Sequence, residues 1–136
     1  MRGLALALVL SAAGFSQAQA QPGAAAVKRT QITQQAIPPK TVATVTVTRL
    51  DFLPGQLTGR HQHPVPVIGY VLEGEFVVKV EGQAERHYTA GQSIYEPADT
   101  TIERFDNAST RQPAVLIATY LAGAGQTELI RLLPAR

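Results

Sequence analysis

The sequence predicts an all-β domain, a sandwich or barrel built from about eight or nine short strands. Two observations lead to this fold class. Segments rich in β-branched and aromatic residues are short, and Gly, Pro, Asn and Asp interrupt them roughly every eight to twelve positions. In addition, no segment carries the apolar stripe of an amphipathic helix, so strands are expected throughout the folded part.

The first element is a leader. Residues 1–20 begin with the basic residue Arg2, continue with the apolar run 4–10 and end in the small-x-small sequence 18–20. This order is typical of a secretory signal peptide, and the apolar run is too short to span a bilayer. We therefore expect a periplasmic or secreted protein that is not inserted in a membrane after cleavage. The remainder is long enough for one domain.

Residues 21–40 are rich in Ala, Gln and Pro and show no sustained period. Pro38 and Pro39 argue against a helix. We expect a flexible N-terminal segment with a possible short edge strand over 27–33, packed on the domain or on a neighbouring subunit. The barrel domain is expected over 41–136.

Residues 41–52 alternate between valine and threonine before Arg49. Val45 and Val47 fall on one face and the threonines on the other, which is the pattern of a half-buried strand. Two further strands are expected at 67–74 and 75–82, joined by a tight turn in which glycine supplies a positive φ. The remaining expected strands cover residues 84–91, 93–97, 100–107, 113–122 and 128–134.

Composition excludes several classes of function. The chain has 12 Lys and Arg against 10 Asp and Glu, a net charge of +2, which is too balanced to indicate nucleic acid as a partner. It has no cysteine, which excludes thiol catalysis, thiolate zinc sites and iron–sulfur clusters. Any metal must therefore be bound by carboxylates and by His61, His63 or His87.

The histidines belong to a spaced motif. Gly55 precedes His61 by six positions, His63 follows one residue further on, and Gly74 lies in the turn after the next strand. This arrangement resembles the first motif of the cupins, which reads Gly, five residues, His-x-His, three or four residues, Glu, six residues, Gly. The motif's glutamate falls on Val67 in this chain.

A second, more divergent motif follows. Gly91 and Pro97 match the cupin pattern Gly, five residues, Pro-x-Gly, two residues, His, three residues, Asn. In this chain the second glycine falls on Asp99, the histidine on Ile102 and the asparagine on Asp106. Two of the four usual metal ligands are thus replaced by aliphatic side chains, Val67 and Ile102.

The resemblance covers roughly residues 41–122 and implies a double-sheet jelly-roll barrel and a homodimer. It also implies a divalent metal, Fe, Mn, Ni or Zn, at His61 and His63, although a site with two ligands missing is also compatible with no metal at all. Alternation along a strand places both histidines on one face, as a metal site requires.

Three residues are candidates for a third ligand. His87 is interpreted as a surface strand residue. Glu103 neighbours Ile102, so strand alternation points it to the opposite face. Glu96 precedes Pro97 in a motif turn and is interpreted as structural, although a register shift or a bulge would change the interpretation of Glu96 or Glu103. Four aromatic side chains are candidates for lining the barrel cavity: Tyr70, Phe76, Tyr95 and Phe105.

Three functions follow from these observations. The first is an exported small-molecule-binding protein in which His61 and His63 are polar anchors of a pocket whose metal site is incomplete. The second is a metal-dependent enzyme, an oxygenase or isomerase by family analogy, with an unidentified third ligand. The third is a structural or partner-binding module with an inert barrel.

Overall fold

The computed structural model describes residues 26–135. The predicted signal peptide, 1–20, and the start of the N-terminal segment lie outside the described residues. Within the described part, no helix is long and apolar enough to cross a membrane.

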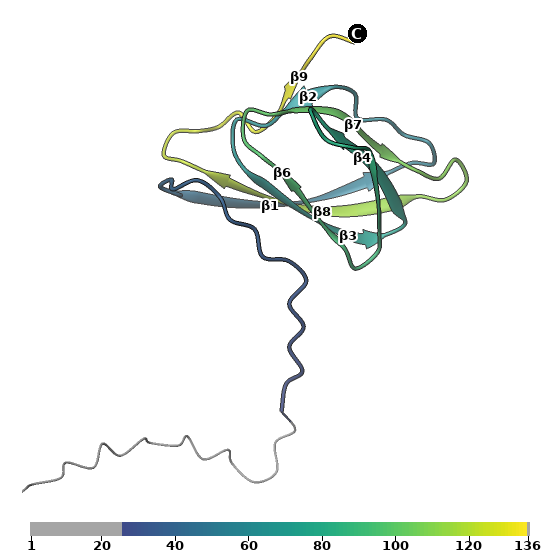
Figure 1. The fold of residues 1–136 in the computed structure, drawn as a ribbon, viewed down its shortest axis with the longest axis horizontal. Helices are drawn as coiled ribbons and strands as arrows, with labels where there is room; N and C mark the ends of the chain where they lie inside the picture. The colour runs from purple at the N-terminus through teal and green to yellow at the C-terminus, as the bar shows by residue number, and fades with distance from the viewer. Residues whose placement is uncertain (1–25, 136) are drawn as a thin grey trace, which may run out of the picture.

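Nine strands form the domain within the described part of the chain, and no helix accompanies them (Figure 1). Each of the expected strands between 41 and 136 is present, with shorter ends than the sequence pattern suggested. The strands are β1 Thr44–Phe52, β2 His61–Gln62, β3 Val67–Glu73, β4 Glu75–Val80, β5 Arg86–Thr89, β6 Ser93–Glu96, β7 Thr101–Asn107, β8 Ala114–Ala122 and β9 Arg131–Leu132.

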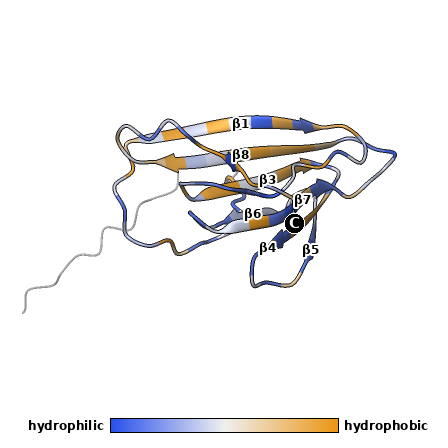
Figure 2. Ribbon diagram, turned by 90° about the horizontal axis from the view of Figure 1, so that it is seen from above, coloured by the Kyte–Doolittle hydropathy of each residue, from blue (hydrophilic) through white to orange (hydrophobic). Residues whose placement is uncertain are grey.

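The strands form two antiparallel sheets, one in the order β1-β8-β3-β6 and the other in the order β5-β4-β7-β2-β9. Figure 2 shows β1, β8 and β3 side by side, with β8 hydrophobic along most of its length. Buried residues from both sheets, including Phe76, Phe105 and Leu116, form one core between them. Two packed sheets with many nonconsecutive neighbours are the jelly-roll barrel that the sequence predicted.

Strand β1 is half-buried, but its inner face is not the valine face. Val45 and Val47 are 58% and 63% exposed, whereas Leu50 packs against the core and Phe52 is buried in it. Because side chains alternate along a strand, the two large residues at the end of β1 determine which face turns inward. The threonines share that inner face, and the valines lie on the outside of the sheet.

The turn between β3 and β4 depends on Gly74, as expected. Gly74 has φ 77°, and a Cβ there would lie 2.8 Å from the Cβ of Ala114 and from the carbonyl oxygen of Pro113. Any larger residue would therefore strain the turn and collide with the neighbouring strand.

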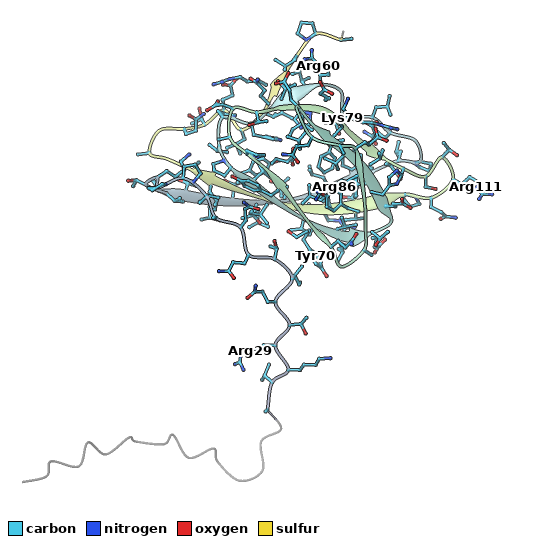
Figure 3. The ribbon with its side chains drawn as sticks, viewed as in Figure 1. Arg29, Arg60, Tyr70, Lys79, Arg86 and Arg111 are labelled. Atoms are coloured by element: carbon cyan, nitrogen blue, oxygen red, sulfur yellow. The ribbon has the colours of Figure 1, made fainter. Side chains whose placement is uncertain are left out.

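The expected edge strand over 27–33 is not formed. Residues 26–43 contain no strand, and the segment leaves the domain from the start of β1 (Figure 1). Its side chains are exposed apart from that of Ile37. Arg29 lies on this segment, while the labelled basic residues Arg60, Lys79 and Arg111 are spread around the domain itself (Figure 3).

Candidate metal centre

His61 and His63 lie together inside the barrel. His61 belongs to β2, which is bordered by β7 and β9, and His63 follows directly after this short strand. They are 2% and 4% exposed, and their ring centroids lie 5.0 Å apart. The expectation that both side chains point to one face is confirmed.

Each imidazole is oriented by a backbone carbonyl. His61 Nδ1 lies 2.8 Å from the oxygen of Gly59, and His63 Nδ1 lies 2.6 Å from the oxygen of Leu129. A carbonyl can only accept, so both Nδ1 atoms carry the proton and donate it. When such a ring is neutral, its Nε2 atom has a lone pair that a metal ion can bind, and when it is protonated, Nε2 donates to Glu96 instead.

Glu96 completes the cluster. It ends β6, is 3% exposed, and places Oε2 3.4 Å from His61 Nε2 and 3.3 Å from His63 Nε2. Among the described residues, these three are the group of His and carboxylate side chains whose ligand atoms converge within 4.8 Å. The three donors are those of a two-histidine, one-carboxylate metal site.

The separations between Glu96 and the two imidazoles are compatible with a shared metal ion as well as with a long ion pair. Charge-assisted N–H···O hydrogen bonds are normally about 2.7–2.9 Å long. By contrast, two atoms that each lie about 2.1 Å from one ion, at the angles of tetrahedral or octahedral coordination, are roughly 3.0–3.4 Å apart. The separations between Glu96 and the two imidazoles fall in the second range.

The three groups also change one another's protonation. Burial by itself raises the pKa of the Glu96 carboxyl, but hydrogen bonds and charge from both histidines outweigh it, and the pKa is lowered from 4.5. Burial opposes protonation of His63, but its contacts with Glu96 and with the Leu129 carbonyl prevail, and its pKa is raised above 6.5. The site therefore favours an ionised carboxylate.

Strand pairing explains why the carboxylate comes from Glu96. Val67, where the cupin motif has its glutamate, is the direct cross-strand partner of Glu96 in the β3–β6 pair. Side chains of paired residues lie on the same face of a sheet, a few ångströms apart. Glu96 thus places a carboxylate beside the two histidines from the neighbouring strand, where the sequence analysis interpreted it as structural. Alternation along β6, where Ile94 is also buried, was the available signal.

The second missing ligand is not replaced in the same way. Ile102, at the position of the motif's histidine, pairs with His61 in the β2–β7 register and is fully buried. Asp99, at the position of the motif's glycine, adopts a positive φ of 55° and its backbone N–H donates to the carbonyl of His63 at 2.7 Å. Asp99 therefore adopts the positive φ that the motif's glycine would provide, and its hydrogen bond fixes the backbone of His63.

The other two ligand candidates lie elsewhere. His87 is exposed on β5 and pairs with Glu75. Glu103 points away from the barrel interior and pairs with Lys79 at 2.8 Å. The position of Glu103 agrees with strand alternation, and His87 is a surface strand residue as expected.

A cavity of about 50 Å³ adjoins the three residues. Of the four aromatic candidates, Phe105 lines it, whereas Phe76 lies in the core against Phe105. Tyr95 lines a separate surface hollow. Tyr70 lies on the outer side of β3, between two residues whose side of the strand is buried (Figure 3). Tyr120, which the sequence analysis did not single out, lines the cavity with its ring 5.6 Å from that of His63.

Comparison with known proteins assigns the family. Residues 48–120 match the family described as Cupin domain. The chain belongs to the cupins. No curated protein matches it in sequence.

Solved cupin structures share this fold. An oxalate oxidase in complex with the substrate analogue glycolate is 26% identical, with a TM-score of 0.57 over 66% of this chain and 46% of that one. An RmlC-like cupin from Shewanella frigidimarina is also 26% identical, with a TM-score of 0.50 over 60% of this chain and 68% of that one. An oxalate decarboxylase from Lactobacillus farciminis, 18% identical with a TM-score of 0.56, covers 66% of this chain and 27% of that one, and shares the fold. The chain thus spans less than half the length of the oxalate oxidase.

Proposed function

We propose that this cupin binds one divalent metal ion through His61 Nε2, His63 Nε2 and Glu96, and that the ion acts on a small molecule held in the adjoining cavity. The observation that carries the proposal is the convergence of three buried donor atoms at metal-ligand spacing, with both Nδ1 atoms engaged by carbonyls. Metal-bound histidines usually donate their other ring N–H to a carbonyl or a carboxylate in this way.

The donor set indicates what kind of metal and chemistry to expect. Two imidazoles and one carboxylate suit Fe, Mn, Ni or Zn, and three protein ligands leave coordination positions for water or a substrate. When bound, such an ion polarises an oxygen atom of its ligand. The neighbouring walls are mainly apolar, so the protein's contribution is to orient the ligand and to limit the access of water.

The set of three candidate ligands favours an enzyme of the oxygenase or isomerase type over a metal-free binding protein. The likeness to an oxalate oxidase that binds the substrate analogue glycolate supports action on a small oxygen-rich molecule. The leader pattern of residues 1–20 supports export to the periplasm or beyond.

The test is a calorimetric titration of the metal-free protein with Fe²⁺, Mn²⁺, Ni²⁺ and Zn²⁺, each in turn. In the Glu96→Gln variant we expect the affinity for the metal to fall by more than about 100-fold. The loss of a residue that only orients a metal ligand already costs about 10–100-fold. Glu103→Gln is the matched control, since it removes a carboxylate of the adjoining sheet that points away from the cavity. Equal affinity of wild type and Glu96→Gln, or no uptake by either, would contradict the proposal.

A further inference from the structure

The ligand atoms of the candidate metal centre are closed off from solvent. All three side chains are at most 4% exposed, so an ion cannot reach them unless part of the surrounding wall moves. Two segments outside the long strands line the adjoining cavity: the loop 53–60, which contributes Thr58, and the C-terminal segment 123–135, which contributes Ile130. We call residues 123–135 the C-terminal strap.

The strap is held less firmly than the loop. Backbone hydrogen bonds tie the loop to β7 inside its sheet, from Thr58 N–H to the Phe105 carbonyl and from Asn107 N–H to the Gln56 carbonyl. The strap instead runs from β8 to β9, a two-residue strand at the edge of its sheet (Figure 1). Every side chain of the strap is exposed or half-buried. A segment with so little buried surface opens at a low free-energy cost.

The strap is attached to the segment that carries the two histidines. Its strand β9 pairs with β2, and Leu133 N–H donates to the Arg60 carbonyl at 2.8 Å. The Arg60 side chain, which lies close to the C-terminal end of the chain in Figure 3, donates from Nη1 to the Pro134 carbonyl at 2.8 Å. Earlier on the strap, the Leu129 carbonyl accepts from His63 Nδ1. Opening the strap therefore removes the acceptor that orients a candidate metal ligand.

The hydrogen bond between His63 and Leu129 couples the strap to metal binding. A neutral imidazole carries one proton, and if that proton is on Nε2, facing Glu96, the Nδ1 lone pair points at the Leu129 oxygen 2.6 Å away. Two acceptors at that distance repel each other, which favours an open strap. When Nε2 binds an ion, the proton must be on Nδ1, and the hydrogen bond holds the strap closed.

We propose that the C-terminal strap is a gate to the metal centre. It opens in the metal-free protein to admit the ion, and it closes when His63 binds the ion, with Ile130 then forming part of the cavity wall. Because coupling between two equilibria is reciprocal, metal binding stabilises the closed strap by the same factor by which closure tightens metal binding. This inference rests on the proposed metal site.

Hydrogen exchange tests the coupling in the intact protein, with Zn²⁺ as the probe because it has no redox chemistry. The measurement is made at about pH 8, above the range in which imidazole is ordinarily protonated. Saturating Zn²⁺ should slow the exchange of strap amides at least about tenfold. Amides of β5, at the opposite edge of the same sheet, should exchange at an unchanged rate, which separates closure of the strap from a general gain in stability.

A crosslink that locks the strap tests the gate itself. Gln62 on β2 and Arg131 on β9 are direct partners in the antiparallel register, so their Cα atoms lie within the range that a disulfide spans. The chain has no cysteine, so the two thiols of Gln62→Cys/Arg131→Cys have no other partner in the chain. The oxidised variant should release Zn²⁺ to a chelator at least about tenfold more slowly than the wild type. Oxidised Glu75→Cys/Thr89→Cys, a paired position of β4 and β5, is the matched control and should release Zn²⁺ as the wild type does.

Protection of the strap by Zn²⁺, together with slow release from the locked variant, supports the gate. If Zn²⁺ binds but the strap exchanges as before, or if the locked variant releases Zn²⁺ as fast as the wild type, this inference is wrong and the metal site stands. A wild type that takes up no Zn²⁺ also overturns this inference. A wild type that takes up none of the four metals overturns the metal site as well.

Discussion

Glu96 is a carboxylate removed from water and held between two imidazoles. Its ionised form depends on them, because burial alone favours the protonated acid. His63 depends on Glu96 in turn, and the carbonyl of Leu129 fixes the orientation of its ring. Removing any one of the three groups therefore leaves a buried polar atom without its partner.

This coupling predicts how the stability of the metal-free protein varies with pH. The lowered pKa of Glu96 contributes stability above about pH 4.5, which is lost as the pH falls through the lowered value. The raised pKa of His63 contributes stability in full below about pH 6.5, which is lost as the pH rises through the raised value. The combined contribution of Glu96 and His63 to the stability of the metal-free protein is therefore largest between about pH 4.5 and about pH 6.5.

The measurement is the midpoint of urea unfolding in the presence of a chelator, at about pH 5.5 and about pH 8.5. The midpoint should be higher at the lower pH, and the difference should shrink in Glu96→Gln. A wild-type midpoint that is equal at both values, or higher at the alkaline one, would show that the coupling does not stabilise the fold.

At the scale of elements, the site is assembled from three places: β2 and its continuation, the end of β6, and the segment before β9 that carries Leu129. The carboxylate that faces the two histidines belongs to Glu96 on β6, whereas the cupin motif has its glutamate at the position of Val67 on β3. The barrel tolerates this because paired positions on two antiparallel strands face the same interior.

A swap of the two side chains tests that explanation. Glu96→Val should abolish metal binding, and the double variant Glu96→Val/Val67→Glu should regain it, because the carboxylate returns to the same interior face from the adjacent strand. Calorimetric titration with the preferred metal compares the two variants. If the double variant binds no better than the single one, cross-strand proximity is not what makes Glu96 a ligand.

The strands and the pair of histidines could be predicted from sequence because alternation and turn residues are local signals. The candidate third ligand could not, because the contact of Glu96 with His61 and His63 depends on the register between distant strands. The local pattern also could not show which face of β1 is buried. That face is decided by the packing of Leu50 and Phe52 in the assembled core, and not by the valines. Tyr120 was missed because a tyrosine in an apolar strand carries no signal of its own.

At the scale of the whole molecule, one face of the β1-β8-β3-β6 sheet faces outward and is largely uncharged. Its central row contains four side chains that are paired across the strands and carry no charge: Val47, Thr119, Ile68 and Tyr95. Charged residues are depleted at the centres of protein–protein interfaces, and the charged pair of this face, Arg49 and Asp51, lies at the end of β1. We expect this face to be covered by a second copy of the chain in a homodimer.

Sedimentation of the wild type should therefore give the mass of a dimer, and Val47→Lys should shift it toward the monomer, because a charge would be buried in the interface. Thr89→Lys, on an exposed position of β5 in the other sheet, is the control and should remain dimeric. A monomeric wild type at micromolar concentration would rule out this assembly.

The central claim is that His61, His63 and Glu96 hold one metal ion, and an anomalous diffraction map from crystals of metal-loaded protein tests it most directly. The account predicts a single strong peak inside the barrel, about 2.0–2.2 Å from His61 Nε2, His63 Nε2 and a carboxylate oxygen of Glu96. A peak at the exposed pair of His87 and Glu75, or no peak in crystals grown with excess metal, would contradict it.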